Sequence, residues 1–80
     1  MAKEKLQIQN EDLKRLGDRI RALRIKKGYS NYESFAYDHN IARAQYGKYE
    51  NGENLRYTSL LRVIKALGVS VQEFFSEGFE

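Results

Sequence analysis

The sequence has no cysteine, a single histidine and no long run of apolar residues. Without cysteine the chain has neither disulfide bridges nor a thiolate metal site, so its stability has to come from the packing of its helices. The longest apolar runs are only a few residues, which is too short for a membrane span or for the core of a signal peptide. We therefore expect a cytoplasmic protein that makes no contact with a membrane.

Residue patterns that support catalysis are also missing. The sequence has no glycine-rich phosphate loop and no cysteine nucleophile, and its one histidine, His39, has no acidic partner at a suitable spacing. No second metal ligand lies at metal-binding distance from His39 along the chain. The sequence therefore predicts a protein that is not an enzyme, with no cofactor, no metal and no small-molecule ligand.

The charge of the chain is unevenly distributed. The 80 residues carry a net charge of +3 at pH 7, and the isoelectric point is about 9.3. Residues 1–27 hold nine basic and four acidic side chains, a balance of +5, whereas residues 28–56 and 57–80 each have a balance of −1. A basic chain is typical of nucleic-acid binders, but a net charge of this size is also typical of ordinary soluble proteins.

Apolar residues recur at steps of three and four along the first third of the chain, which predicts an α-helix. This helix is expected to run from residue 10 or 11 to residue 27, with residues 1–10 as a flexible arm. Gly28 follows as the left-handed residue that ends the helix. Gly17, inside the helix, indicates a close approach by a neighbouring helix.

Two short helices joined by a tight turn are expected next. The second helix should begin at the capping box formed by Ser30 and Glu33 and end near His39. Asn40 then lies where the chain turns sharply, since asparagine tolerates positive φ. The third helix is expected over residues 42–50. Such a pair is a helix-turn-helix, whose second helix can enter the major groove of DNA.

The third helix has two different faces. Ile41, Tyr46 and Tyr49 are expected to be buried. The opposite face carries hydrogen-bond donors with small residues between them: Arg43, Ala44, Gln45, Gly47 and Lys48. A helix that inserts among the edges of DNA bases needs a face with donors and little bulk between them. The same residues also form an ordinary solvated helix surface.

A fourth helix is expected over residues 57–67 and a short fifth helix from about residue 71. Gly68 ends the fourth helix, and Ser70 with Glu73 forms a capping box for the fifth. Repeats and low-complexity segments are absent from the sequence. The chain is therefore expected to divide into a flexible N-terminal arm, a helix-turn-helix domain and a short C-terminal tail, over residues 1–10, 11–77 and 78–80.

Several groups of residues, taken together and in order, resemble the Cro/CI-type (XRE) family of helix-turn-helix regulators. They are Ile20-Arg21-Ala22-Leu23-Arg24, Ala36, Tyr49-Glu50-Asn51-Gly52, and Ala66-Leu67-Gly68-Val69-Ser70 followed by Phe74-Phe75. The resemblance covers residues 13–76 and implies an all-α, compact five-helix lambda-repressor-like DNA-binding domain. The chain departs from the family pattern at Asn40, Ala42, Tyr46 and Tyr49, and in one extra residue between Gly28 and Ala36.

The resemblance also implies roles for particular residues. Contacts with DNA bases are implied for Arg43, Ala44, Gln45 and Lys48. Contacts with the DNA backbone are implied for Asn31, Tyr32, Asn51, Arg56 and Tyr57. Because of the extra residue, either Asn31 or Tyr32 takes the phosphate contact at the head of the second helix. Arg24 and Glu50 are implied as a buried ion pair with a structural role.

The resemblance implies sequence-specific binding of double-stranded DNA by a transcriptional regulator. We expect a repressor that acts as a homodimer on a palindromic operator, because a single helix in one groove binds weakly. Phe74, Phe75 and Phe79 are candidates for the dimer surface, with one of the first two expected to close the core instead. The alternative is a protein-interaction module on the same fold, such as an antitoxin or a bridging co-factor.

Overall fold

The computed structural model describes the backbone of residues 2–80 and the side chains from Asn10 onward. Over these residues it contains five α-helices and no strand. They are α1 (Ala2–Lys26), α2 (Tyr32–Asp38), α3 (Arg43–Glu50), α4 (Tyr57–Leu67) and α5 (Val71–Phe74). The predicted all-α fold with five helices is confirmed.

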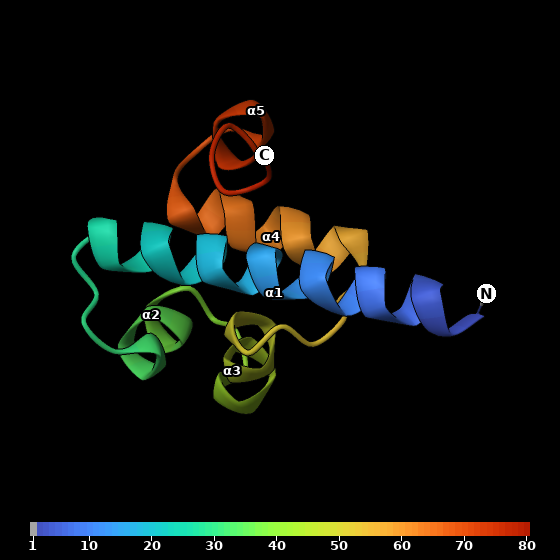
Figure 1. Cartoon of the computed structure of the whole chain (residues 1–80). Helices are drawn as coiled ribbons and strands as arrows, with labels where there is room; N and C mark the ends of the chain where they lie inside the picture. The colour runs from blue at the N-terminus through green and yellow to red at the C-terminus, as the bar shows by residue number, and fades with distance from the viewer. Residues whose placement is uncertain (1) are drawn as a thin grey trace.

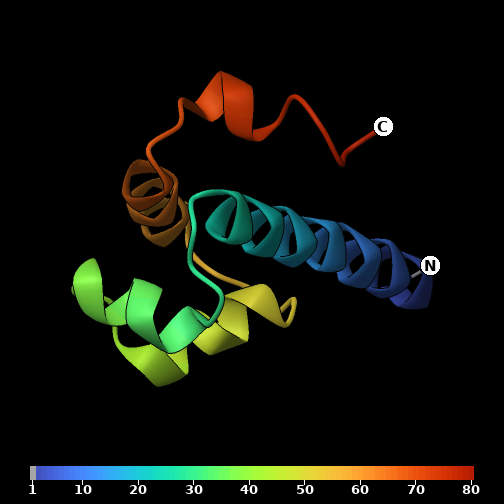
Figure 2. The same ribbon diagram turned by 90° about the vertical axis from the view of Figure 1, so that its left-hand side faces the viewer.

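The other helices pack around the C-terminal half of α1. In Figure 1, α2 and α3 lie on one side of α1 and α5 lies on the opposite side, with α4 next to α1. Figure 2, turned by 90°, shows the same separation of the helix-turn-helix from α5. The outward side of α2 and α3 is therefore not covered by any other helix.

Every helix contributes to one hydrophobic core, whose burial is the main favourable contribution to folding. The predicted inward residues of α2, Phe35 and Ala36, are fully buried. The apolar residues of the core are Ile20, Leu23, Phe35, Ala36, Tyr46, Tyr49, Leu60, Val63, Ile64, Leu67 and Phe74.

The helix α1 begins at Ala2, about two turns before the expected start at residue 10 or 11. The predicted boundary is wrong because it was set by apolar periodicity. Residues 2–9 lack that period, but they include Ala, Lys, Glu, Leu and Gln, which favour helix, and neither glycine nor proline. The division into an arm over residues 1–10, a domain over 11–77 and a tail over 78–80 stays a prediction.

The helix α2 is capped by Asn31 and not by Ser30. The side-chain oxygen of Asn31 accepts a hydrogen bond from the backbone N–H of Ser34 at 2.8 Å, and Tyr32 is the first residue of the helix. The expected capping box of Ser30 and Glu33 is therefore wrong. Serine and asparagine are about equally good N-caps, so the geometry of the preceding turn decides between them.

The turn between α2 and α3 has the expected conformation. Asn40 has φ of 57° and is the only non-glycine residue with positive φ in the described part of the chain. The backbone N–H of Ile41 then donates to the carbonyl of Ala36 at 2.8 Å. The predicted sharp turn at Asn40 is confirmed, and it sets the direction in which α3 leaves.

The helices α1 and α3 are in backbone contact at Gly17. A Cβ atom at this position would lie 2.6 Å from the carbonyl oxygen of Glu50 and 2.8 Å from that of Tyr49. Real Cβ atoms do not approach backbone oxygens so closely. The predicted close approach at Gly17 is confirmed, and it fixes the C-terminal end of α3 against α1.

Candidate DNA interface

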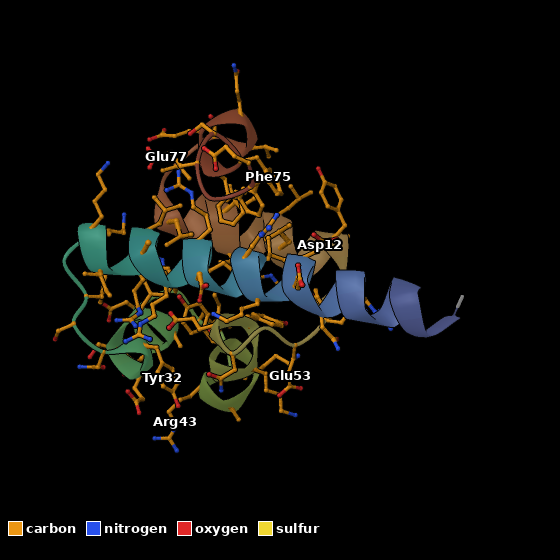
Figure 3. The ribbon with its side chains drawn as sticks, in the orientation of Figure 1. Asp12, Tyr32, Arg43, Glu53, Phe75 and Glu77 are labelled. Atoms are coloured by element: carbon orange, nitrogen blue, oxygen red, sulfur yellow. The ribbon has the colours of Figure 1, made fainter. Side chains whose placement is uncertain are left out.

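The helix α3 has one buried and one exposed face. Tyr46 and Tyr49 are 0% and 7% exposed. The four residues with expected base contacts are all exposed: Arg43, Ala44, Gln45 and Lys48. All four side chains are therefore open to solvent, and Figure 3 shows Arg43 on the side of the molecule away from α5.

An ion pair ties the end of α3 to α1. The Nε atom of Arg24 lies 2.8 Å from Oε2 of Glu50, and Nη2 lies 3.1 Å from Oε1, so that the contact is bidentate. The Nη1 atom of Arg24 donates to the carbonyl of Tyr29 at 2.7 Å. Both charged side chains are less than a tenth exposed. The hydrogen bonds to Glu50 raise the pKa of Arg24, so the guanidinium stays charged.

The same ion pair determines the charge of the exposed face. Glu50 is the only acidic residue of α3, and its carboxylate is turned inward to Arg24. The charges that α3 presents to solvent are therefore those of Arg43 and Lys48, both positive. Tyr46, next to the pair, adds no charge, because burial and the nearby carboxylate of Glu50 both raise the pKa of its hydroxyl.

The N-terminus of α3 has no side-chain cap. Ala42 occupies the N-cap position and makes no side-chain hydrogen bond to the helix. A serine or threonine at this position would add about 1 kcal/mol of helix stability. The helix is held in place by its buried tyrosines and by the ion pair at its other end.

The residues with expected backbone contacts lie in two groups along the chain, one at the start of α2 and one from the end of α3 to the start of α4. Asn31 and Tyr32 are at the start of α2. Asn51 follows α3, and Arg56 and Tyr57 are at the start of α4. Asn51, Arg56 and Tyr57 are exposed, and Tyr57 is 62% exposed. The ring of Tyr32 lies against Gly47, in the second half of α3, and Asn51 directly follows the last residue of α3.

Figure 3 shows how the labelled residues of this region lie. Tyr32, Arg43 and Glu53 are all on the side of the molecule away from α5, whereas Phe75 and Glu77 are on the side of α5. Glu53 is exposed and places one negative charge in the loop after α3. The candidate interface is therefore positive on α3 and mixed in charge at its edge.

His39 packs on the turn between α2 and α3. Its ring centroid lies 4.5 Å from that of Phe35 and 6.1 Å from that of Tyr29. Within the part of the chain that the structure describes, no group of three or more His, Cys, Asp or Glu side chains is arranged to hold a metal ion. The position of His39 is that of a residue covering the turn.

The three C-terminal aromatic residues have different environments. Phe74 is fully buried, so its assignment as a dimer candidate is wrong, because its ring completes the core of its own chain. Phe75 is 40% exposed, and its ring centroid lies 4.9 Å from that of Phe79, which is half-buried. Phe75 and Phe79 thus leave an aromatic surface beside α5.

The contact that holds α5 was missed by the sequence analysis. The Nε atom of Arg19 donates to the carbonyl of Phe74 at 2.7 Å, and Nη2 donates to the carbonyl of Glu73 at 2.9 Å. The side chain of Arg19 therefore binds the last carbonyls of α5 to α1. A single arginine on a basic helix gives no sequence signal for such a role.

Comparison with known proteins agrees with this geometry. Residues 20–74, more than half of the chain, match the family model described as helix-turn-helix. The chain belongs to the Cro/CI-type (XRE) helix-turn-helix family. Control protein C.MunI of Mycoplasma sp is 34% identical over 64 residues, which are 79% of this chain and 86% of that protein. No solved structure shows a significant match.

Membership of the XRE family identifies the type of fold and the general role of the protein. The five helices form a lambda-repressor-like domain in which α2 and α3 are the helix-turn-helix. The protein is a DNA-binding transcriptional regulator, in a family that is typically non-enzymatic. Over residues 2–80, no helix combines the length and the apolar character needed to cross a membrane.

Proposed function

We propose that this protein represses transcription by binding as a homodimer to a palindromic site in double-stranded DNA. The observation that carries the proposal is the exposed face of α3, which presents Arg43, Ala44, Gln45 and Lys48 while its one acid is held by Arg24. An XRE-family relative named a control protein is consistent with a regulatory role. Repression needs no catalysis, since a bound dimer occludes the promoter.

Direct readout of bases is assigned to the exposed face of α3. Arg43 and Lys48 donate hydrogen bonds to O6 and N7 of guanine, and Gln45 pairs with adenine. The methyl group of Ala44 contacts the methyl group of thymine. Arg43 and Lys48 are expected to contribute most of the discrimination, because contacts of Arg and Lys with guanine are the commonest specific ones.

Contacts with the DNA backbone are assigned to the residues at the start of α2 and to those that follow α3. Phosphates are contacted by Asn31 and Tyr32 from the first group and by Asn51, Arg56 and Tyr57 from the second, which fixes the position of α3 in the groove without reading the sequence. Arg56 is exposed and lies at the N-terminus of α4, where the helix dipole also favours a phosphate.

Replacing Arg43 with alanine is expected to weaken binding to the specific site by about 1–3 kcal/mol and to relax preference at one base pair. Arg56→Ala is the matched control, because it also removes one exposed arginine. It should weaken binding to all sequences alike, and the number of counterions released on binding, read from the salt dependence of the affinity, should fall by about one. Titration of specific and scrambled duplexes at several salt concentrations measures both effects. An unchanged sequence preference in Arg43→Ala would contradict its assignment.

Dimerisation is assigned to the surface beside α5. Val71 and Phe75 are each 40% exposed there, next to the half-buried ring of Phe79. Gel filtration with light scattering is expected to show a dimer, and Phe75→Ser is expected to shift it toward monomer, because the substitution removes apolar surface. A wild-type protein that stays monomeric both at high concentration and on DNA would contradict the dimer.

A further inference from the structure

The residues that follow α5 fold back onto the aromatic surface that is proposed for dimerisation. We call residues 76–80 the strap, and it lies on the side of the molecule away from α2 and α3 (Figure 2). The strap turns at Gly78, which has φ of 90°. The ring centroid of Phe79 then lies 4.9 Å from that of Phe75 and 6.1 Å from that of the buried Phe74. Phe79 therefore covers part of the surface beside α5.

Hydrogen bonds do little to hold the strap in this position. Its first residue, Ser76, is fixed to the end of α5, because its backbone N–H and its hydroxyl both donate to the carbonyl of Glu73. Among the described residues, the one hydrogen bond of the other four strap residues is internal. The backbone N–H of Gly78 donates to the carboxylate of Glu80 at 3.0 Å. The strap can therefore move away from α5 without breaking a hydrogen bond to another element.

The strap is also loosely packed against α1. A hollow of about 310 Å³ is lined by residues of both, among them Gly78 of the strap and Arg15 and Ala22 of α1. Atoms next to such a gap make fewer dispersion contacts than atoms of a filled interior. The half-buried ring of Phe79 is therefore the main contact that keeps the strap in place.

The apolar surface that the strap leaves open is small for a dimer. Val71 and Phe75 are each 40% exposed, and even a whole aromatic side chain offers only about 150–250 Å². Each partner in a specific, stable interface buries about 800 Å². Moving the ring of Phe79 away would uncover more of Phe75 and Phe74, and so would enlarge the apolar surface at the same place.

We propose that the strap shields the dimer surface in the monomer, and that a second copy of the chain displaces Phe79 from α5 when the dimer forms. The inference rests on the proposed dimer and adds a means of regulating its surface. The apolar contact of Phe79 is exchanged for a larger apolar contact with the second copy. Because both copies have to open, the free energy of opening enters twice into the dissociation constant of the dimer. The strap thus raises the protein concentration at which dimers form.

Gly78→Ala tests the proposal, since it loosens the strap without removing an apolar side chain. Residues other than glycine rarely adopt φ of 90°. An added Cβ atom would meet only Cδ of Arg19, at an ordinary contact distance of 4.0 Å. The dissociation constant of the dimer, measured by analytical ultracentrifugation over a range of concentrations, is expected to fall at least about fivefold below the wild-type value.

Gly28→Ala is the matched control for Gly78→Ala. Gly28 has φ of 107° and lies between α1 and α2, with no atom within 4 Å of an added Cβ. The substitution therefore introduces similar backbone strain outside the strap, and the dissociation constant of the dimer should stay at the wild-type value. A second comparison uses two aromatic residues. Phe79→Ser is expected to strengthen the dimer, whereas Phe75→Ser weakens it.

Nuclear magnetic resonance follows the displacement itself. Cross-peaks between the ring protons of Phe75 and Phe79 should be present at concentrations where the protein is monomeric and should be lost in the dimer. Their persistence in the dimer would overturn the inference.

Two further results would overturn the inference while leaving the proposed dimer intact. One is a dissociation constant in Gly78→Ala that is unchanged or higher than in wild type. The other is a weaker dimer in Phe79→Ser, which would show that Phe79 is part of the interface in its observed position. A wild-type protein that stays monomeric at high concentration and on DNA would instead overturn the proposed dimer itself.

Discussion

Replacing Glu50 with alanine is expected to lower the free energy of unfolding by about 3–5 kcal/mol, the usual cost of removing one partner from a buried ion pair. Arg24 is only 4% exposed, so its guanidinium is buried. Of the hydrogen-bond partners that the structure shows for this guanidinium, only the carbonyl oxygen of Tyr29 would remain without Glu50. A loss of this size is a large part of the stability of a small domain, so the variant should melt far below wild type.

Glu53→Ala is the matched control for Glu50→Ala. Glu53 is exposed and follows the end of α3, and its replacement is expected to change stability by less than about 0.5 kcal/mol. Urea denaturation followed by circular dichroism measures both variants. If Glu50→Ala unfolds at the wild-type midpoint, the pair does not hold α3 to α1.

Gly17→Ala is expected to cost at least about 2 kcal/mol, even though alanine is favoured over glycine in a helix by about 1 kcal/mol. The added Cβ atom would lie 2.6 Å and 2.8 Å from two carbonyl oxygens of α3. Overpacking a core typically costs about 1–3 kcal/mol. Here the neighbours are backbone atoms, which cannot rotate away, so α1 and α3 have to separate.

Gly47→Ala is the control for Gly17→Ala, because it makes the same change inside another helix. The added methyl group meets the ring of Tyr32, a side chain that can move. Thermal unfolding is therefore expected to separate the two variants, with Gly17→Ala lower and Gly47→Ala unchanged or higher. Equal stability of Gly17→Ala and wild type would show that the helices do not need this close contact.

The sequence predicted those parts of the fold that depend on local chemistry. Asn40 was identified as the turn because few residues accept positive φ, and Gly17 as a close approach because glycine is costly in a helix. The start of α1 and the cap of α2 were not predicted correctly. The helix α1 extends back to Ala2 because residues 2–9 favour helix, although they show no apolar period. The cap of α2 could not be predicted because Ser30 and Asn31 are adjacent and about equally good N-caps.

Only part of the candidate interface could be predicted in the same way. The two faces of α3 follow from helical periodicity, but the pairing of Arg24 with Glu50 was implied only by the resemblance to the XRE family. Phe74 and Phe75 could not be told apart, because α5 has only four residues and gives no period. The packing of Tyr32 on Gly47 depends on the angle between two helices, and glycine inside α3 was its only sequence signal.

Selection of bound sites from random double-stranded DNA tests recognition by α3 most directly. The expected result is enrichment of a palindrome whose half-sites lie about one helical turn apart. Binding to the enriched site is expected to weaken steeply as salt rises, because phosphate contacts release counterions. Failure to enrich any sequence, with no salt-dependent binding to duplex DNA, would contradict the account and favour a protein-interaction module on the same fold.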